Sequence, residues 1–198
     1  HNAVGDLTAF LAALDLKQNS WGVLTMYLGR YIGTETDGVS WGIAHTDSVM
    51  GSMTTNLAII NVTEGIPTAI VNIRAPRGIT SEQVKTAVNE RIDVINKEYG
   101  AALSLSMRLG PFHYVPTDGK LVNTLLEVWE EVTGEPGEAI SIGGGTQARL
   151  FPNGVDFGLS TDQVHYRGHG ADEYMKPEEL FIAAELTISA LLRLTTTE

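Results

Sequence analysis

The sequence predicts an α+β fold in which helices cover one face of an antiparallel sheet, joined to a partial α/β layer. Two apolar segments, 57–63 and 68–75, have the composition of strands and are separated by a short turn that contains Gly and Pro. An amphipathic helix and a third alternating segment, 103–109, follow them. The order helix, strand, strand, helix, strand indicates an antiparallel sheet covered by helices, and not a parallel α/β sheet.

The first helix is predicted at the start of the chain, with Asn2 as its N-cap. Its apolar residues recur at helical spacing: Val4, Leu7, Phe10, Leu11 and Leu14. The following segment, 17–56, is punctuated by glycines and predicts only brief strands. The pattern becomes sharp again at Leu57, where the first long strand begins.

The helix after the two strands opens with a capping box, Thr80-Ser81-Glu82-Gln83, in which a hydroxyl and an amide three residues later satisfy the first turn. Gly100 ends this helix. Its apolar face is predicted from Val84, Ala87, Val88, Ile92 and Ile95. In segment 103–109, leucines and a methionine alternate with polar residues, so we expect a strand of the same antiparallel sheet with Arg108 in solvent.

A second domain is expected after residue 111, which divides the chain into 1–111 and 112–198. A helix over 120–133 carries an apolar face formed by Leu121, Leu125, Val128, Trp129 and Val132. Short strands at 139–142 and 155–158 lie on either side of a glycine-rich loop and a helical turn. The last helix begins at Pro177, and its apolar face is predicted from Phe181, Ala184, Ile188, Leu191 and Leu192.

Composition excludes several classes of protein. The formal net charge of -11 argues against a nucleic-acid binder and against a protein that binds anionic membranes, because both need clustered Lys and Arg. The absence of Cys excludes disulfides, thiolate metal sites and cysteine nucleophiles. No apolar run is long enough to span a bilayer and no signal peptide is visible, so a cytoplasmic location is expected.

Two features could bind an anionic group. Arg74 and Asn72 share one face of the second strand, where an Arg fork can grip a carboxylate; the alternative is a surface arginine at a strand end. Gly143-Gly144-Gly145-Thr146 follows a predicted strand and precedes a helical turn, so its bare backbone amides could hold an anion. The alternative is a tight turn, and phosphate binding is disfavoured because no Gly-Lys-Ser follows.

Histidines near acidic residues suggest two candidate metal sites. His165 and His169, followed by Asp172 and Glu173, are the raw material of a zinc or manganese site; the alternative is exposed loop residues. His45 has the His-x-Asp spacing of a ligand pair, but the residues after it do not continue such a motif. We therefore expect a solvated turn with a hydrogen-bonded histidine there.

Several segments together resemble the co-catalytic zinc peptidases of the PepV-like dipeptidase, carboxypeptidase-G and aminoacylase type. In the second domain these are IGGGTQARL (142–150), NGVDFG (153–158) and HGADEYM (169–175). In the first domain, Asn72-Ile73-Arg74 is similar to a strand of that family's lid domain, and residues 2–11 to its lid helix. The HYVP sequence after Phe112 is similar to the return from lid to catalytic domain.

The resemblance implies a ferredoxin-like lid joined to part of a catalytic domain, and hydrolysis of a dipeptide or similar amide next to a free carboxylate. It implies two zinc ions, with manganese or cobalt as alternatives, and a metal-activated water. His169 matches a metal ligand of the family. Arg74 and the loop Gly143–Thr146 match positions that hold the substrate's terminal carboxylate, and Asn72 lies on the strand face of Arg74.

The family's other metal ligands, a bridging Asp and a Glu-Glu pair among them, have no convincing counterpart in these 198 residues. We therefore expect the chain to correspond to the lid and the C-terminal part of the catalytic domain, and to be inactive alone. The alternative function is a non-catalytic binding or dimerisation module, because the lid of this family often forms a homo-oligomer interface and an exposed sheet edge suits that role.

Overall fold

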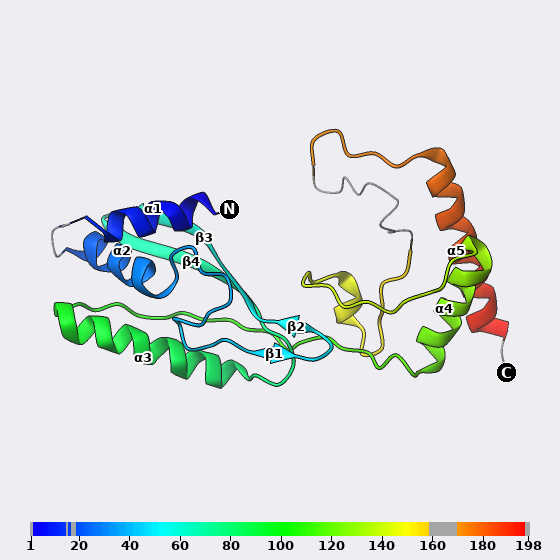
Figure 1. Cartoon of the computed structure of the whole chain (residues 1–198), viewed down its shortest axis with the longest axis horizontal. Helices are drawn as coiled ribbons and strands as arrows, with labels where there is room; N and C mark the ends of the chain where they lie inside the picture. Colours follow the sequence, from blue (N-terminus) through cyan, green and yellow to red (C-terminus); the bar gives the residue numbers. More distant parts are fainter. Residues whose placement is uncertain (1, 15, 17–18, 159–169, 197–198) are drawn as a thin grey trace. The chain divides into compact units, whose positions relative to one another are not determined.

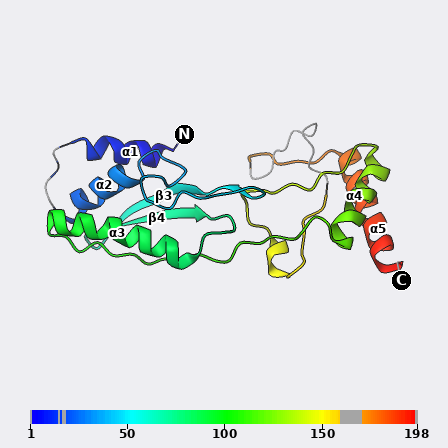
Figure 2. The ribbon, with the colours of Figure 1, turned by 60° about the horizontal axis from the view of Figure 1, so that its bottom comes forward.

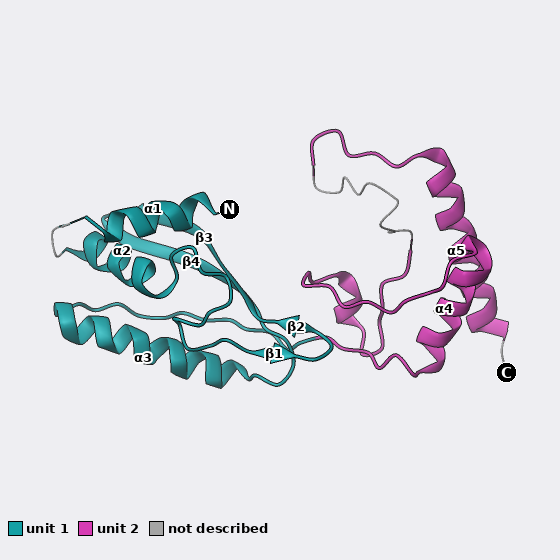
Figure 3. Cartoon of the chain, in the orientation of Figure 1, with its two compact units in different colours: residues 1–112 teal, residues 113–198 magenta. Residues whose placement is uncertain are grey.

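The computed structural model describes residues 2–14, 16, 19–158 and 170–196. It divides into two compact units, unit 1 over residues 1–112 and unit 2 over residues 113–198 (Figure 3). The predicted α+β class is confirmed, since helices combine with two small antiparallel sheets. Unit 1 contains α1 (Ala3–Ala12), α2 (Ser20–Tyr31), β1 (Thr46–Asp47), β2 (Gly51–Ser52), β3 (Thr54–Thr63), β4 (Ile66–Arg74) and α3 (Ser81–Tyr99) (Figure 1). Unit 2 contains α4 (Lys120–Thr133), the 3₁₀ helix η1 (Gln147–Leu150) and α5 (Pro177–Thr196).

The predicted start of α1 and both predicted ends of α3 are confirmed. The Oδ1 atom of Asn2 caps α1 by accepting hydrogen bonds from the backbone N–H of Val4 and of Gly5. Both halves of the capping box between Thr80 and Gln83 are formed at the start of α3. The helix ends at Gly100, whose left-handed conformation (φ 59°) lets the chain turn back.

Strands β3 and β4 form an antiparallel hairpin with one face toward the core and one toward solvent. On β4, Ala69, Val71 and Ile73 are half-buried, while the alternate residues are exposed. A register shift between Leu57 and Ile59 interrupts β3. The alternation of inward-facing and outward-facing residues therefore does not continue unbroken from one side of the shift to the other. The outward face of β4 carries Ile66, Thr68, Ile70, Asn72 and Arg74.

The predicted strand at 103–109 is wrong as an assignment of secondary structure, although its burial pattern is confirmed. No strand is assigned there, and the segment runs back along α3 (Figures 1 and 2). Leu103, Leu105, Met107 and Leu109 pack against the core, and Arg108 is exposed as expected. The side chain of Asn96 accepts from the N–H and donates to the C=O of Leu103, at 2.7 and 2.9 Å. Alternation therefore identified a half-buried extended chain and not a hydrogen-bonded ladder.

Helix α2 lies where only brief strands were predicted. Glycines at positions 22 and 29 give its sequence low helix propensity. In the structure Gly29 serves close packing, because a Cβ added there would lie 2.3 Å from the Cβ of Ala12 on α1. A Cβ on Gly5 would likewise lie 2.4 Å from the carbonyl oxygen of Gly33. Gly29, one of the two glycines that hid α2 from sequence analysis, is thus what lets α1 approach this helix.

The core of unit 1 lies between α2, α3 and the inward face of the hairpin. Its most deeply buried large side chains are Leu28, Ile43, Met53, Leu57, Val84, Val88 and Ile95. A buried hydrogen bond of 2.6 Å runs from Nε1 of Trp41 to the hydroxyl of Tyr27. Burial raises the pKa of Tyr27 to about 12, so this hydroxyl stays neutral across the physiological range.

In unit 2, α4 and α5 pack together around a small core. The predicted apolar face of α4 is confirmed, since the residues predicted for it either form this core or pack against it.

The predicted apolar face of α5 is wrong. Leu186 and Ala190 are the buried residues of α5, whereas Phe181 is 73% and Leu191 58% exposed. α5 has apolar residues on both faces, and the buried residues lie on the side opposite to the residues that the sequence predicted. The predicted strands at 139–142 and 155–158 are also not assigned as strands.

Candidate functional site

The exposed face of the β3–β4 hairpin carries the predicted pair Asn72 and Arg74. Both side chains project from β4 on the side away from the core, as the alternation predicted. The strand register places Thr54 opposite Arg74 and Asn56 opposite Asn72. Directly opposite residues of an antiparallel pair have Cβ atoms about 4.5–5.5 Å apart. The structure therefore groups a guanidinium, two amides and a hydroxyl near one end of the hairpin.

Sequence analysis missed Asn56 and its contact with the start of α1. The Nδ2 atom of Asn2 donates to the Oδ1 atom of Asn56 at 2.7 Å and to the carbonyl of Leu57 at 2.9 Å. The outward-facing position of Asn56 on β3 could have been read from the alternation, but its pairing with Asn72 depends on the register. The register in turn depends on the irregularity between Leu57 and Ile59.

The glycine loop Gly143-Gly144-Gly145-Thr146 lies in unit 2 and leads into η1, as expected. The hydroxyl of Thr146 accepts from the N–H of Ala148 and donates to a carboxylate oxygen of Asp156 at 2.5 Å. A Cβ added to Gly145 would lie 2.8 Å from Nη1 of Arg149. The absence of a side chain at Gly145 thus lets Arg149 fold over the loop, a contact that the sequence did not reveal.

The predicted metal ligand His169, and His165 with it, lie outside the described residues. Asp172 and Glu173 are described and exposed. Among the residues that the structure describes, no three His, Cys, Asp or Glu side chains gather into a group that could hold a metal ion. The described residues alone therefore do not form the two-zinc site that the resemblance implies.

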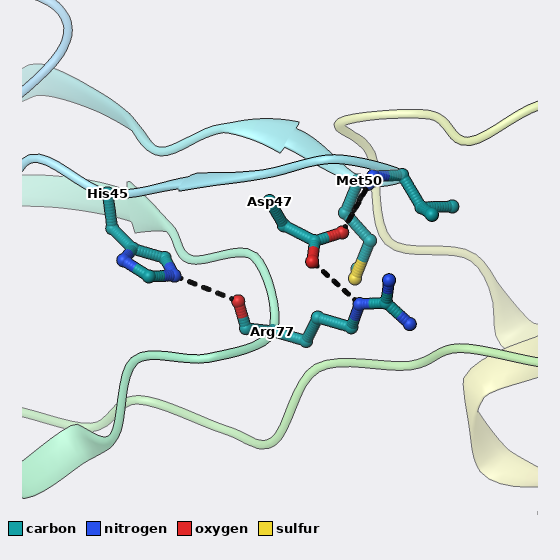
Figure 4. Close-up of polar contacts among 5 residues, drawn as sticks. His45, Asp47, Met50 and Arg77 are labelled. Carbon is teal, nitrogen blue, oxygen red and sulfur yellow. Dashed lines mark hydrogen bonds and ion pairs between the residues drawn. The ribbon is translucent and has the colours of Figure 1, made fainter.

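His45 and Asp47 take part in a structural contact with the loop after β4 (Figure 4). Nε2 of His45 lies 3.0 Å from the carbonyl oxygen of Arg77. Nε of Arg77 donates to Oδ2 of Asp47 at 2.7 Å, and Oδ1 of Asp47 accepts from the N–H of Val49 and of Met50. The two side chains thus hold a turn in place, as the interpretation of a hydrogen-bonded histidine expected.

The hydrogen bond from the Arg77 side chain lowers the pKa of Asp47 to about 2, and the N–H of Met50 contributes. Because this value is below the usual 3.8, the carboxylate stabilises the fold above about pH 4, and its contribution is lost as the pH falls through about 2. We expect Asp47→Asn to lower the urea midpoint at pH 6 and the difference from wild type to vanish near pH 2. A difference that is the same at both pH values would contradict this role.

Two hollows in the described residues lie away from these groups. One, of about 360 Å³, lies in unit 1 and is lined by residues that include Met26, Arg30 and Tyr99. The other, of about 350 Å³, lies in unit 2 and is lined by residues that include Pro116 and Lys120. Neither includes Arg74 or the glycine loop. Asn72, Arg74 and the three glycines of the loop are exposed.

None of the helices in the described part of the chain has the length and apolar character needed to cross a membrane.

Comparison with known proteins points to peptidases. The chain is 30% identical to the Beta-Ala-Xaa dipeptidase of Lactobacillus delbrueckii subsp. lactis in an alignment of 208 residue positions. This alignment covers 96% of this chain and 43% of that enzyme. It is 29% identical over 189 residues to proteins named as putative dipeptidases in Staphylococcus aureus strains USA300 and NCTC 8325 / PS 47, covering 95% of this chain and 39% of each.

No family model matches the chain. The resemblance to dipeptidases is nevertheless confirmed over almost its whole length. The chain spans about two-fifths of the length of the relatives that it matches.

Proposed function

We propose that this chain is the substrate-binding part of a dipeptidase, which hydrolyses a dipeptide or similar amide next to a free carboxylate. The observation that supports the proposal most is the exposed pair Asn72 and Arg74 on β4, in a chain that is similar to dipeptidases over almost all its length. Its substrates are small peptides. The cytoplasmic location expected from the sequence is part of the same proposal.

In this proposal Arg74 binds the terminal carboxylate of the peptide. A guanidinium presents N–H donors in a planar fork, which matches the two oxygens of a carboxylate. Asn72 lies two residues away on the same exposed face, where its amide can bond either to the carboxylate or to the adjacent peptide group. The chemistry of this face therefore favours an anionic peptide end over an uncharged one.

The glycine loop Gly143–Thr146 is proposed as a second substrate contact through its backbone amides. Support comes from the hydrogen bonds of Thr146 with Asp156 and Ala148, which hold the last residue of the loop in place. Zinc, with manganese or cobalt as alternatives, is proposed as the metal of the complete enzyme, with His169 as a ligand. Because the described residues do not form a metal site, no catalytic step is assigned through the metal.

The isolated 198-residue chain is expected to bind less than one zinc ion per molecule and to show no dipeptide turnover. A stable catalytic site needs three or four protein ligands, and the resemblance supplies one, His169. Metal content after dialysis and a ninhydrin assay for released amino acids would check this, with the full-length Lactobacillus dipeptidase as the positive control. Stoichiometric zinc together with dipeptide hydrolysis would mean that the chain is a sufficient enzyme by itself.

A second candidate function is a non-catalytic module that associates through unit 1. Leu7 and Phe10 on α1 are 52% and 62% exposed, and Ile66 and Ile70 are exposed on the outer face of the hairpin. A dipeptide-binding assay, read together with sedimentation velocity, separates the two functions. A homodimer that fails to bind dipeptides would favour the module, whereas dipeptide binding favours the enzyme whether or not the chain dimerises.

A further inference from the structure

We propose that Asn153 is a site of spontaneous deamidation, where a neutral side-chain amide becomes a carboxylate. The backbone nitrogen of Gly154 attacks Cγ of Asn153, and a succinimide ring forms. The bond between Cγ and Nδ2 breaks, and the side-chain nitrogen leaves as ammonia with the proton of the Gly154 N–H. Water then opens the ring at either carbonyl, which gives an aspartate or an isoaspartate. Water is the only co-reactant, and nothing is oxidised or reduced.

The sequence contains the residue pair that favours this reaction. Asn153 precedes Gly154, and no other asparagine among the 198 residues precedes a glycine. A side chain on the following residue would hinder the approach of its backbone nitrogen to the amide carbon, and glycine has no side chain. The attack on Asn153 is therefore the least hindered one that the chain offers.

Packing against η1 explains why a glycine follows Asn153. A Cβ added to Gly154 would lie 2.4 Å from the carbonyl oxygen of Ala148, a residue of η1. Such a contact is with backbone, so a side chain at this position would force the loop away from η1. The fold thus places an unhindered nitrogen directly after Asn153.

The surroundings of Asn153 leave its side chain accessible. The residue is exposed, and among the described residues its amide has no hydrogen-bond partner. It lies in the turn from Phe151 to Gly154, which is closed by a hydrogen bond of 3.1 Å from the N–H of Gly154 to the carbonyl of Phe151. Opening this turn frees the attacking nitrogen and leaves the hydrogen bonds within α4 and α5 intact.

An isoaspartate would disturb two contacts of the same loop, because it routes the backbone through the side chain and inserts a methylene group before Gly154. Nε2 of His113 lies 2.7 Å from the carbonyl oxygen of Gly154, to which it must donate because a carbonyl only accepts. Two residues further on, Asp156 accepts from the hydroxyl of Thr146, at the end of the glycine loop. We therefore expect the modification to change the surroundings of both His113 and Thr146.

The test is incubation of the whole folded 198-residue chain at mildly alkaline pH, followed by peptide mapping with mass spectrometry and labelling by an isoaspartate methyltransferase. We expect Asn153 to lose its amide before any other asparagine. Asn123 is the internal control, since it is exposed in the same unit but lies within α4 and precedes Thr124. Asn153→Gln should abolish the isoaspartate at this position, because its longer side chain would have to close a larger ring.

The same chain unfolded in urea shows how fast Asn153 reacts without the turn. Conversion of Asn153 in urea but not in the folded chain, or in neither, would overturn the inference. Faster conversion of Asn123 than of Asn153 in the folded chain would also overturn it.

NMR spectra of the ¹⁵N-labelled chain follow the effect on the loop. The His113 ring and Thr146 amide signals should shift as isoaspartate accumulates. Freshly prepared Asn153→Asp is the matched control, because it adds the carboxylate without lengthening the backbone and should shift these signals less. Unchanged signals in the isoaspartate form would contradict the expected disturbance of the loop.

Discussion

Replacing Arg74 with alanine is expected to weaken binding of a dipeptide with a free terminal carboxylate by about ten- to a hundredfold. The reason is the loss of a charge-assisted, two-pronged contact with the carboxylate. Arg74→Lys should recover only part of the affinity, because an ammonium group is a point charge without the planar fork. In a catalytically active dipeptidase that contains this chain, the same substitution should raise KM and lower kcat/KM for such substrates.

The matched control is Arg108→Ala, which removes another exposed arginine of unit 1. Its Kd for the same dipeptide should equal that of the wild type. Equal losses in both variants would mean that binding depends on overall charge and not on Arg74. Since Arg74 is exposed, the thermal unfolding of Arg74→Ala should remain close to that of the wild type.

Truncating Leu186 to alanine is expected to destabilise unit 2 by about 2–5 kcal/mol, the usual cost of a cavity in a close-packed core. Leu186 is completely buried against α4 in the small core of this unit. Leu191→Ala removes the same atoms from the opposite side of α5, where the side chain is 58% exposed. It should change stability by no more than about 0.5 kcal/mol.

Hydrogen exchange of the α4 and α5 amides would measure both effects within unit 2. A larger loss of protection in Leu191→Ala than in Leu186→Ala would contradict the packing of α5. It would mean that the face formed by Phe181, Ile188 and Leu191 is the buried one, as the sequence pattern alone predicted.

Local signals predicted much of unit 1. The capping box at Thr80, the cap at Asn2 and the end of α3 at Gly100 each depend on a few neighbouring residues, and all three are confirmed. The two faces of β4 followed from alternation. Helix α2 could not be found in this way, because Gly29 lowers helix propensity and its purpose, the close approach of Ala12, lies on another helix.

Helix α5 illustrates a different limit. A periodic pattern identifies the apolar face of a helix when the other face is polar. In α5 both Leu186 and Ile188 belong to apolar stripes, and the pattern favoured the stripe with the larger side chains. Only the position of α4 determines which stripe is buried, and that is tertiary information.

The candidate site was predicted in the same uneven way. Arg74 and Asn72 were identified because they share a strand face, which a single strand reveals. Asn56 was missed because its place beside them depends on the pairing of β3 with β4. Its orientation depends on Asn2, which is 54 residues away in the chain.

The most direct test of the proposed function compares a dipeptide with its C-terminal amide in NMR titrations of the wild-type 198-residue chain. The two ligands have the same side chains and peptide bond and differ only in the terminal carboxylate. We expect the free acid to shift the signals of Arg74 and of the neighbouring β4 amides in a saturable way, with an affinity about tenfold or more above that of the amide. Equal affinities for the acid and the amide, or no shifts at Arg74 with either, would contradict the proposal that this chain binds the carboxylate end of a peptide.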